Sequence, residues 1–242
     1  LILREYGGGK KLPKPAEPRE VPAAVVCRPK DMKCYGSFKE FSADFPFDEK
    51  KPVIAFLYYG HIYPMDYSGA VAEICERLQK NANVLPVAVS GMDGINDGTL
   101  KKLLTEFMPA KTELIMNCMS FRLSAGPMGG NISAGTDMLK ELNVPYLHPL
   151  FMSRRTEKDW NDSIQGCTAS EVLISVMLPE QDGAMLTLPV GAKTEPAYNE
   201  EFDVTSDEIK IIEERLEALA DRAERFIELR KKARSAKKIA II

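Results

Sequence analysis

Several features that would assign a protein class at once are missing from this sequence of 242 residues. No segment approaches the roughly 18 consecutive apolar residues that a membrane-spanning helix needs, so membrane insertion is not expected. The first residues also lack the basic segment followed by an apolar segment that marks a secretory signal. We therefore expect a cytoplasmic protein.

Cysteine pairs with metal-binding spacing are absent as well. The five cysteines are odd in number and include no C-x-x-C pair, which argues against a disulfide framework and against a zinc ribbon. Cys75 falls on the apolar face of a predicted helix and Cys118 lies in an apolar run, so we expect both thiols to be packing residues. Histidine and tryptophan are also scarce, with two and one in the chain.

The chain has no basic stretch that would suit nucleic acid. Its net charge is −3, divided as +2 over residues 1–50, −7 over residues 51–206 and +2 over residues 207–242. The segment expected to form the folded core would therefore repel a phosphate backbone. An acidic cleft there is better suited to cations.

Hydrophobic patterning predicts an α/β fold, a doubly wound and mostly parallel sheet with flanking helices and a long C-terminal helix. Residues 1–49 are rich in proline and are predicted to form an extended lead-in. Over residues 50–204, apolar runs such as Val53–Tyr59 alternate with amphipathic segments. This alternation is typical of parallel strands buried on both faces and joined by helices.

The C-terminal part is predicted to be one amphipathic helix over residues 205–236. Thr205 and Glu208 have the spacing of a capping box, and apolar residues follow at alternating intervals of three and four. We favour docking of this helix on the same domain over a coiled-coil dimer. Residues 237–242 resemble the opening strand of a further domain, so we expect a truncated piece of a longer protein.

Ligands of open parallel sheets bind beyond the carboxyl ends of the strands, which directs attention to the segments after the apolar runs. His61 directly follows the first strand, where it could bind a metal or move a proton, or equally hydrogen-bond its own loop. The glycine-rich stretch around residues 120–131 lacks the lysine of a phosphate-binding loop, so nucleotide binding is weakly supported. Such a loop also lets a flat ligand approach the backbone, and Arg122 within it could hold a carboxylate.

A second candidate is the acidic turn at residues 178–183. Glu180 and Asp182 stand between a proline and a glycine, so their carboxylates could project into a cleft and accept protons or bind a hard cation. On spacing alone, an ordinary polar turn is the more common interpretation.

Six motifs, in order along residues 52–242, resemble the large subunits of cobaltochelatase and magnesium chelatase, the CobN and magnesium chelatase H type. The likeness identifies the chain as an internal fragment of such a subunit. The motifs are Tyr58-Tyr59-Gly60-His61, Asn117-Cys118-Met119-Ser120-Phe121, Asn143-Val144-Pro145, Trp160-x-x-Ser163-x-x-Gly166, Leu178-Pro179-Glu180-x-Asp182-Gly183 and Arg215-x-x-x-Leu219-x-x-Arg222-Ala223.

The resemblance implies ATP-dependent insertion of a divalent metal, cobalt or magnesium, into a tetrapyrrole. In such a system the large subunit holds the macrocycle and the metal, while separate AAA+ subunits hydrolyse ATP. On this basis His61, Glu180 and Asp182 are expected to deliver the metal or accept pyrrole protons, with His61 and Glu180 as metal ligands. Residues expected to contact the ring or its peripheral carboxylates are Phe121, Arg122, Arg154, Arg155, Trp160 and Ser163.

One departure from the family pattern bears on the metal. Magnesium-type members often have histidine where this chain has Thr168, which favours cobalt and a corrinoid precursor in cobalamin biosynthesis. Magnesium insertion into protoporphyrin remains an alternative, as do a small-ligand-binding α/β module without chemistry and a docking scaffold. Because essential parts of the subunit are expected elsewhere, the fragment alone should show no turnover.

Overall fold

A computed structural model describes residues 7, 21–60, 67–91, 93–126 and 129–239 of the chain. Its centre is an eight-stranded sheet with the order β12-β9-β8-β5-β3-β4-β1-β2. Five central strands are parallel neighbours, namely β9 (Met185–Lys193), β8 (Tyr146–Thr156), β5 (Thr112–Asn117), β3 (Val53–Tyr59) and β4 (Asn83–Val89). The predicted doubly wound, mostly parallel sheet is therefore confirmed.

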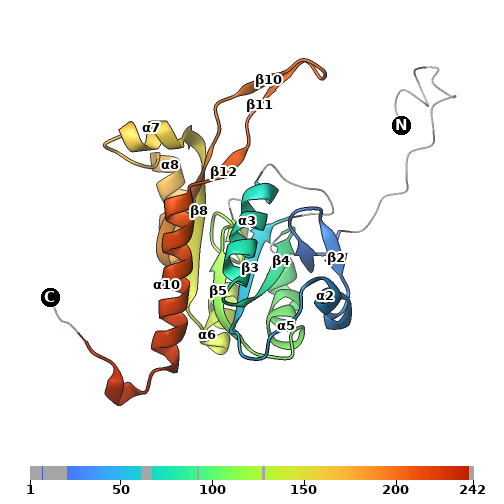
Figure 1. Cartoon of the computed structure of the whole chain (residues 1–242), viewed down its shortest axis with the longest axis vertical. Coiled ribbons are helices and arrows are strands. Elements are labelled where there is room, and N and C mark those ends of the chain that lie inside the picture. The colour runs from blue at the N-terminus through green and yellow to red at the C-terminus, as the bar shows by residue number, and fades with distance from the viewer. Residues whose placement is uncertain (1–6, 8–20, 61–66, 92, 127–128, 240–242) are drawn as a thin grey trace.

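Both edges of this sheet are antiparallel. On one side β1 (Ala24–Arg28) pairs with β4 and with β2 (Lys33–Tyr35), and on the other β12 (Ile209–Ile211) pairs with β9. Two small ribbons accompany the sheet. They are formed by β6 (Ala125–Gly126) with β7 (Gly129–Gly130) and by β10 (Ala197–Asn199) with β11 (Val204–Ser206). The β10–β11 ribbon projects from the body of the molecule (Figure 1).

Successive residues of a strand point to opposite sides of the sheet, so a strand that is apolar throughout has two faces to bury. Helices cover both faces. On one face Ile54 and Phe56 pack in the same cluster as α3 (Ser68–Gln79) and α10 (Glu213–Lys231). On the other face Ala55 and Leu57 pack with α2 (Phe38–Asp44), α4 (Asp93–Asn96), α5 (Thr99–Glu106) and α6 (Ile132–Leu142). Each face thus has its own hydrophobic core.

Short helical segments follow the carboxyl end of β8. They are α7 (Glu157–Asp162), α8 (Ala169–Val172), a π-helical turn η1 (Leu173–Met177) and α9 (Leu178–Gln181), of which the last three are consecutive. A 3₁₀ turn, η2 (Arg234–Ala236), follows α10. None of the helices in the described ranges is both long and apolar enough to cross a bilayer.

Two expected boundaries are corrected. Residues 22–49 are not merely a lead-in, because β1, β2 and α2 complete one edge of the sheet and its core. The last helix begins at Glu213 instead of at residue 205, and Thr205 lies in β11. Backbone pairing of β10 with β11 and of β9 with β12 has overridden the local capping pattern.

The apolar residues that recur every three or four positions along α10 form a seam, and this seam faces the core of the domain. Leu216, Leu219 and Ala223 are buried in the core cluster that also contains α3 and β3. Figure 1 shows the helix lying along the body of the molecule. Docking on its own domain, the favoured interpretation of the seam, is confirmed.

Candidate functional site

The sheet has a topological switch point between β3 and β5. The chain leaves β3 through α3 on one face and leaves β5 through α6 on the opposite face, so the two connections diverge from neighbouring strands. A crevice at the carboxyl ends of the strands is expected at such a point. Here the hydroxyl of Tyr59, the last residue of β3, donates to the carbonyl of Ser120 beyond β5 at 2.9 Å.

A pocket of about 210 Å³ lies at these carboxyl ends. Most of its wall is apolar or backbone, and the only charged side chain among its described lining residues is that of Arg122. The lining residues are Tyr59, Val89, Gly91, Ile95, Met119, Ser120, Phe121, Arg122, Leu123, Ala125 and Gly126. Such a wall suits the edge of a flat, largely apolar ligand.

The loop that carries Phe121 is held in an unusual backbone conformation. Phe121 has a φ of 69°, in the left-handed region that side chains rarely adopt, and its N–H donates to the carbonyl of Ile174 at 2.6 Å. The hydroxyls of Ser120 and Ser175 are 3.0 Å apart. Both contacts reach the π-helical turn η1, a type of irregularity that is frequent at functional sites.

Arg122 and Asp182 form a buried ion pair. The guanidinium contacts Oδ1 of Asp182 at 2.7 Å through Nε and at 2.5 Å through a terminal nitrogen. Oδ2 of the same carboxylate accepts the backbone N–H of Leu123 at 2.7 Å, and the Asp182 side chain has 0% exposure. Both oxygens are thus engaged, so these contacts support a positioning role for Asp182, which ties the 120–126 loop to the turn after α9.

The carboxylate of Glu180 has a different environment from that of Asp182, although the two residues are only two positions apart. The Glu180 side chain is exposed, and one carboxylate oxygen lies 3.5 Å from the hydroxyl of Thr187 on β9. This carboxylate is available to a proton or a cation. Of the residues predicted from the sequence, the structure brings Arg122 and Asp182 into contact, and Phe121 lines the same pocket as Arg122. Glu180 points elsewhere, toward Thr187.

A buried polar layer under the 117–120 segment was missed by sequence reasoning. The side-chain amide of Asn117 donates to the hydroxyl of Tyr146 at 2.7 Å, and its Oδ1 accepts the N–H of Met119 at 3.0 Å. Nearby on β8 stands His148, with 0% exposure and no hydrogen-bond partner for either ring nitrogen among the described residues. The available signal was a histidine, one of only two, inside a short apolar run.

Burial makes this layer electrically neutral. It lowers the pKa of His148 to about 4, against a smaller opposing effect of backbone groups of Asn117 and Ser175. Burial also raises the pKa of the Tyr146 hydroxyl and that of the Tyr59 hydroxyl. At neutral pH the imidazole and both phenols are therefore uncharged.

The remaining predicted residues form a second group around α7. Trp160 lies in a small core with residues of β8 and β9, and the guanidinium of Arg215 sits 4.9 Å from its ring centroid. The backbone N–H of Arg154 donates to Glu171 at 3.3 Å, and the Ser163 hydroxyl accepts the N–H of Gln165 at 3.2 Å. Arg155 is half-buried at the end of β8. None of these residues lines the switch-point pocket.

An open groove of about 720 Å³ runs beside α7, and its charge distinguishes it from the switch-point pocket. Its wall carries both signs of charge, from Glu157, Lys158, Asp162, Lys193, Glu195 and Lys210. Such a surface is less suited to a flat apolar ring than the pocket is.

No complete metal site occurs in the described part of the chain. Within those residues there is no group of three or more His, Cys, Asp or Glu side chains that could hold a metal ion. His61, the residue expected to act in metal delivery and proton acceptance, lies outside the described residues. Its role and the metal-ligand role of Glu180 therefore stay predictions.

Comparison with known proteins places these features in a family. The family model described as CobN/Magnesium Chelatase matches residues 1–242. The chain is 30% identical over 197 residues to the chloroplastic magnesium-chelatase subunit ChlH of Oryza sativa subsp. indica, covering 80% of this chain and 13% of that protein. It is 26% identical over 197 residues to the aerobic cobaltochelatase subunit CobN of Sinorhizobium sp, covering 79% and 14%.

A solved structure has the same fold. The catalytic subunit of cobaltochelatase from Mycobacterium tuberculosis matches with a TM-score of 0.59 and 21% identity over 78% of this chain and 16% of that one. The chain spans at most 19% of the length of the first curated relatives that it matches. On the full-length family match, the chain belongs to the CobN/magnesium chelatase family.

Proposed function

We propose that this chain is part of the tetrapyrrole-binding large subunit of a metal chelatase, in which the switch-point pocket receives one edge of the macrocycle. The observation that carries the proposal is the apolar pocket at the carboxyl ends of β3, β4 and β5, in a chain that matches the chelatase family over residues 1–242. A volume of about 210 Å³ is small for a whole ligand, because complete pockets typically measure about 300–1,000 Å³. Other parts of the subunit would enclose the rest of the ring.

Each predicted residue then has a distinct task. Phe121 contacts the face or edge of the ring, and Arg122, held by Asp182, fixes the loop and offers its remaining N–H groups to a peripheral carboxylate. Glu180 is the exposed carboxylate that accepts a pyrrole proton or passes on the metal together with His61. Arg154, Arg155, Trp160 and Ser163 form a separate surface at α7 that meets the peripheral groups of the ring.

The divalent metal is a substrate in this scheme. ATP is hydrolysed by separate AAA+ subunits, which would dock on the complete large subunit. For the metal we propose cobalt, with a corrinoid precursor as acceptor. The support for this choice is that magnesium-type members often have histidine where this chain has Thr168, whose hydroxyl caps α8 in a capping box with Glu171. Magnesium and protoporphyrin are the alternative, because relatives named for each metal match the chain at 26–30% identity.

Tetrapyrrole binding tests the pocket. Full-length protein should be titrated with hydrogenobyrinic acid diamide and with protoporphyrin, with Co²⁺ or Mg²⁺, while ring absorbance and the quenching of tryptophan fluorescence are followed. We expect Phe121→Ala to weaken binding about tenfold, because an aromatic ring that packs against the macrocycle is lost. Phe202→Ala is the matched control, since Phe202 is 66% exposed on the loop between β10 and β11. Equal affinities of the two variants would place the macrocycle elsewhere.

The role of Glu180 needs the complete enzyme. Glu180→Gln in an insertion assay with the ATPase partners should lower the rate at least tenfold while leaving tetrapyrrole affinity unchanged, because only the proton- or metal-accepting charge is removed. Turnover equal to that of the wild type would remove Glu180 from the chemistry.

A further inference from the structure

Two cysteine side chains meet at the edge of the sheet, away from the switch-point pocket. Cys27 on β1 and Cys34 on β2 are directly opposite each other in the antiparallel register, and their sulfur atoms are 3.1 Å apart. A disulfide bond is roughly 2.05 Å long, so the two sulfurs need to approach by only about 1 Å. Both thiols are free in the structure.

The backbone already has the separation that a disulfide requires. Directly opposed residues of antiparallel strands have Cα atoms about 4.5–5.5 Å apart. This range lies inside the roughly 4.4–6.8 Å found for bridged cysteines, so the strand register is compatible with a disulfide.

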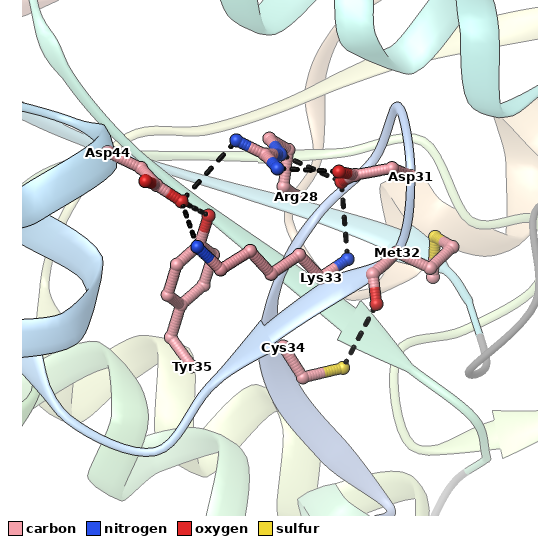
Figure 2. Close-up of polar contacts among 7 residues, drawn as sticks. All are labelled: Arg28, Asp31, Met32, Lys33, Cys34, Tyr35 and Asp44. Atoms are coloured by element: carbon pink, nitrogen blue, oxygen red, sulfur yellow. Dashed lines mark hydrogen bonds and ion pairs between the residues drawn. The ribbon is translucent and has the colours of Figure 1, made fainter.

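Ion pairs link the hairpin to its own turn and to α2. Arg28 contacts Asp31 at 2.5 and 2.7 Å, and Asp44 receives Lys33 at 2.6 Å and the Tyr35 hydroxyl at 2.6 Å. Figure 2 shows these groups gathered on one side of the hairpin, with the Cys34 side chain directed away from Asp44 and toward the carbonyl of Met32. The hairpin thus has backbone pairing and polar contacts that do not involve the thiols.

The two thiols differ in access. Cys34 is exposed, whereas Cys27 is fully buried in the core beneath α3, where burial raises its pKa. Reagents in solution therefore meet Cys34 first. The Cys27 sulfur already contacts the sulfur of Cys34, so it is placed to act as the resolving thiol, although its raised pKa slows formation of the thiolate that must attack.

We propose that Cys27 and Cys34 form a reversible disulfide by exchange with a low-molecular-weight disulfide. The Cys34 thiolate attacks one sulfur of the reagent, forming a mixed disulfide and releasing one thiol. The Cys27 sulfur, after losing its proton, attacks the Cys34 sulfur, and the second reagent thiol leaves. Two protein thiols are oxidised and one reagent disulfide is reduced to two thiols, so electrons and protons balance.

The disulfide would stabilise the β1–β2 hairpin, which contacts the end of β3. The Tyr58 hydroxyl donates to the carbonyl of Cys27 at 2.9 Å. The Met32 side chain lies 3.3 Å from where a Cβ on Gly60 would stand. The hairpin that carries the two cysteines therefore packs against the strand that leads into the switch-point pocket.

The test is a redox titration of the chain with reduced and oxidised glutathione, followed by acid quenching, alkylation and tryptic digestion. Trypsin separates the two cysteines into residues 20–30 and 34–39, because Arg28 precedes a proline and is not cleaved. We expect these two peptides to become joined, with a mass two hydrogens below their sum. We also expect the joined peptides to separate again on return to reduced glutathione.

Single variants separate the two steps. In Cys27→Ser we expect a stable glutathione adduct on Cys34, and in Cys34→Ser the joined peptide should fall to background. Cys167→Ser is the control that should match the wild type. Thermal unfolding checks that each variant is folded, and the oxidised wild type should melt higher than its reduced form. Absence of the joined peptide at every glutathione ratio, or pairing of Cys34 with Cys167 instead, would overturn the proposal.

Discussion

Asp182 and Glu180 carry the same functional group two residues apart, yet the fold gives them opposite environments. The side chain of Asp182 has 0% exposure and is paired with Arg122, whereas Glu180 is exposed. Removing one partner of a buried ion pair leaves an uncompensated charge, which costs about 3–5 kcal/mol. An exposed carboxylate contributes little to stability.

The paired substitutions Asp182→Asn and Glu180→Gln test this difference, because both exchange a carboxylate for an amide. We expect Asp182→Asn to lower the free energy of unfolding by about 3 kcal/mol or more and Glu180→Gln to change it by less than about 0.5 kcal/mol. Urea unfolding at pH 7 measures both. Similar values for the two variants would contradict the buried pair.

His148 should make the protein sensitive to acid. Its pKa is about 4 in the folded state and 6.5 in the reference state, so well above pH 6.5 the ring is neutral in both states and has no effect. As the pH falls from 6.5 toward 4, the imidazole binds a proton in the unfolded chain but not in the folded chain. The free energy of unfolding therefore decreases. A difference of about 2.5 pH units corresponds to about 3 kcal/mol.

We expect His148→Gln to remove this part of the acid dependence. Urea unfolding of the wild type and the variant between pH 7.5 and 4.5 separates the histidine from the carboxylates, which titrate in both proteins. The wild type should lose stability faster as the pH falls. Parallel curves would show that His148 titrates normally in the folded state.

At the scale of the element, α10 has one face in the core and one in water. Leu219 is 1% exposed and packs with α3 and β3, while Leu229 on the same helix is 49% exposed. We expect Leu219→Ala to cost about 2–5 kcal/mol and Leu229→Ala less than about 1 kcal/mol. Thermal or urea unfolding measures both, and equal costs would mean that the seam does not dock as described.

At the scale of the whole molecule, the first strands are part of the domain. Val26, Tyr35 and Phe41 are buried in the core on one face of the sheet, and β1 covers the edge of β4. A chain that begins at residue 50 would expose that edge and that core. We expect it to aggregate or to unfold without cooperativity, as judged by gel filtration and circular dichroism.

A chain that begins at residue 21 is the control for this deletion, since it keeps β1, β2 and α2. It should remain monomeric and unfold cooperatively, unlike the chain that begins at residue 50. Cooperative, monomeric behaviour of the chain that begins at residue 50 would instead return residues 22–49 to the role of a dispensable lead-in.

Local patterns in the sequence were sufficient for the central sheet and most of the helices. A run such as Val53–Tyr59 is apolar at every position because both faces of its strand are covered. This pattern can be recognised in the sequence without knowing which elements cover the strand. The seam of α10 was visible for the same reason, since a helix that docks must repeat its apolar residues every three or four positions. The six motifs also pointed to the chelatase family before any contact was known.

Contacts between distant residues depend on the three-dimensional fold and leave no local periodicity. Arg122 and Asp182 are 60 positions apart, and nothing near either residue indicates that the other neutralises it. The same is true of the burial of His148 and of the contact between Cys27 and Cys34, which depends on strand register. The switch-point pocket likewise exists because β3 and β5 become neighbours although β4 lies between them in the chain, an arrangement set by packing of the entire sheet.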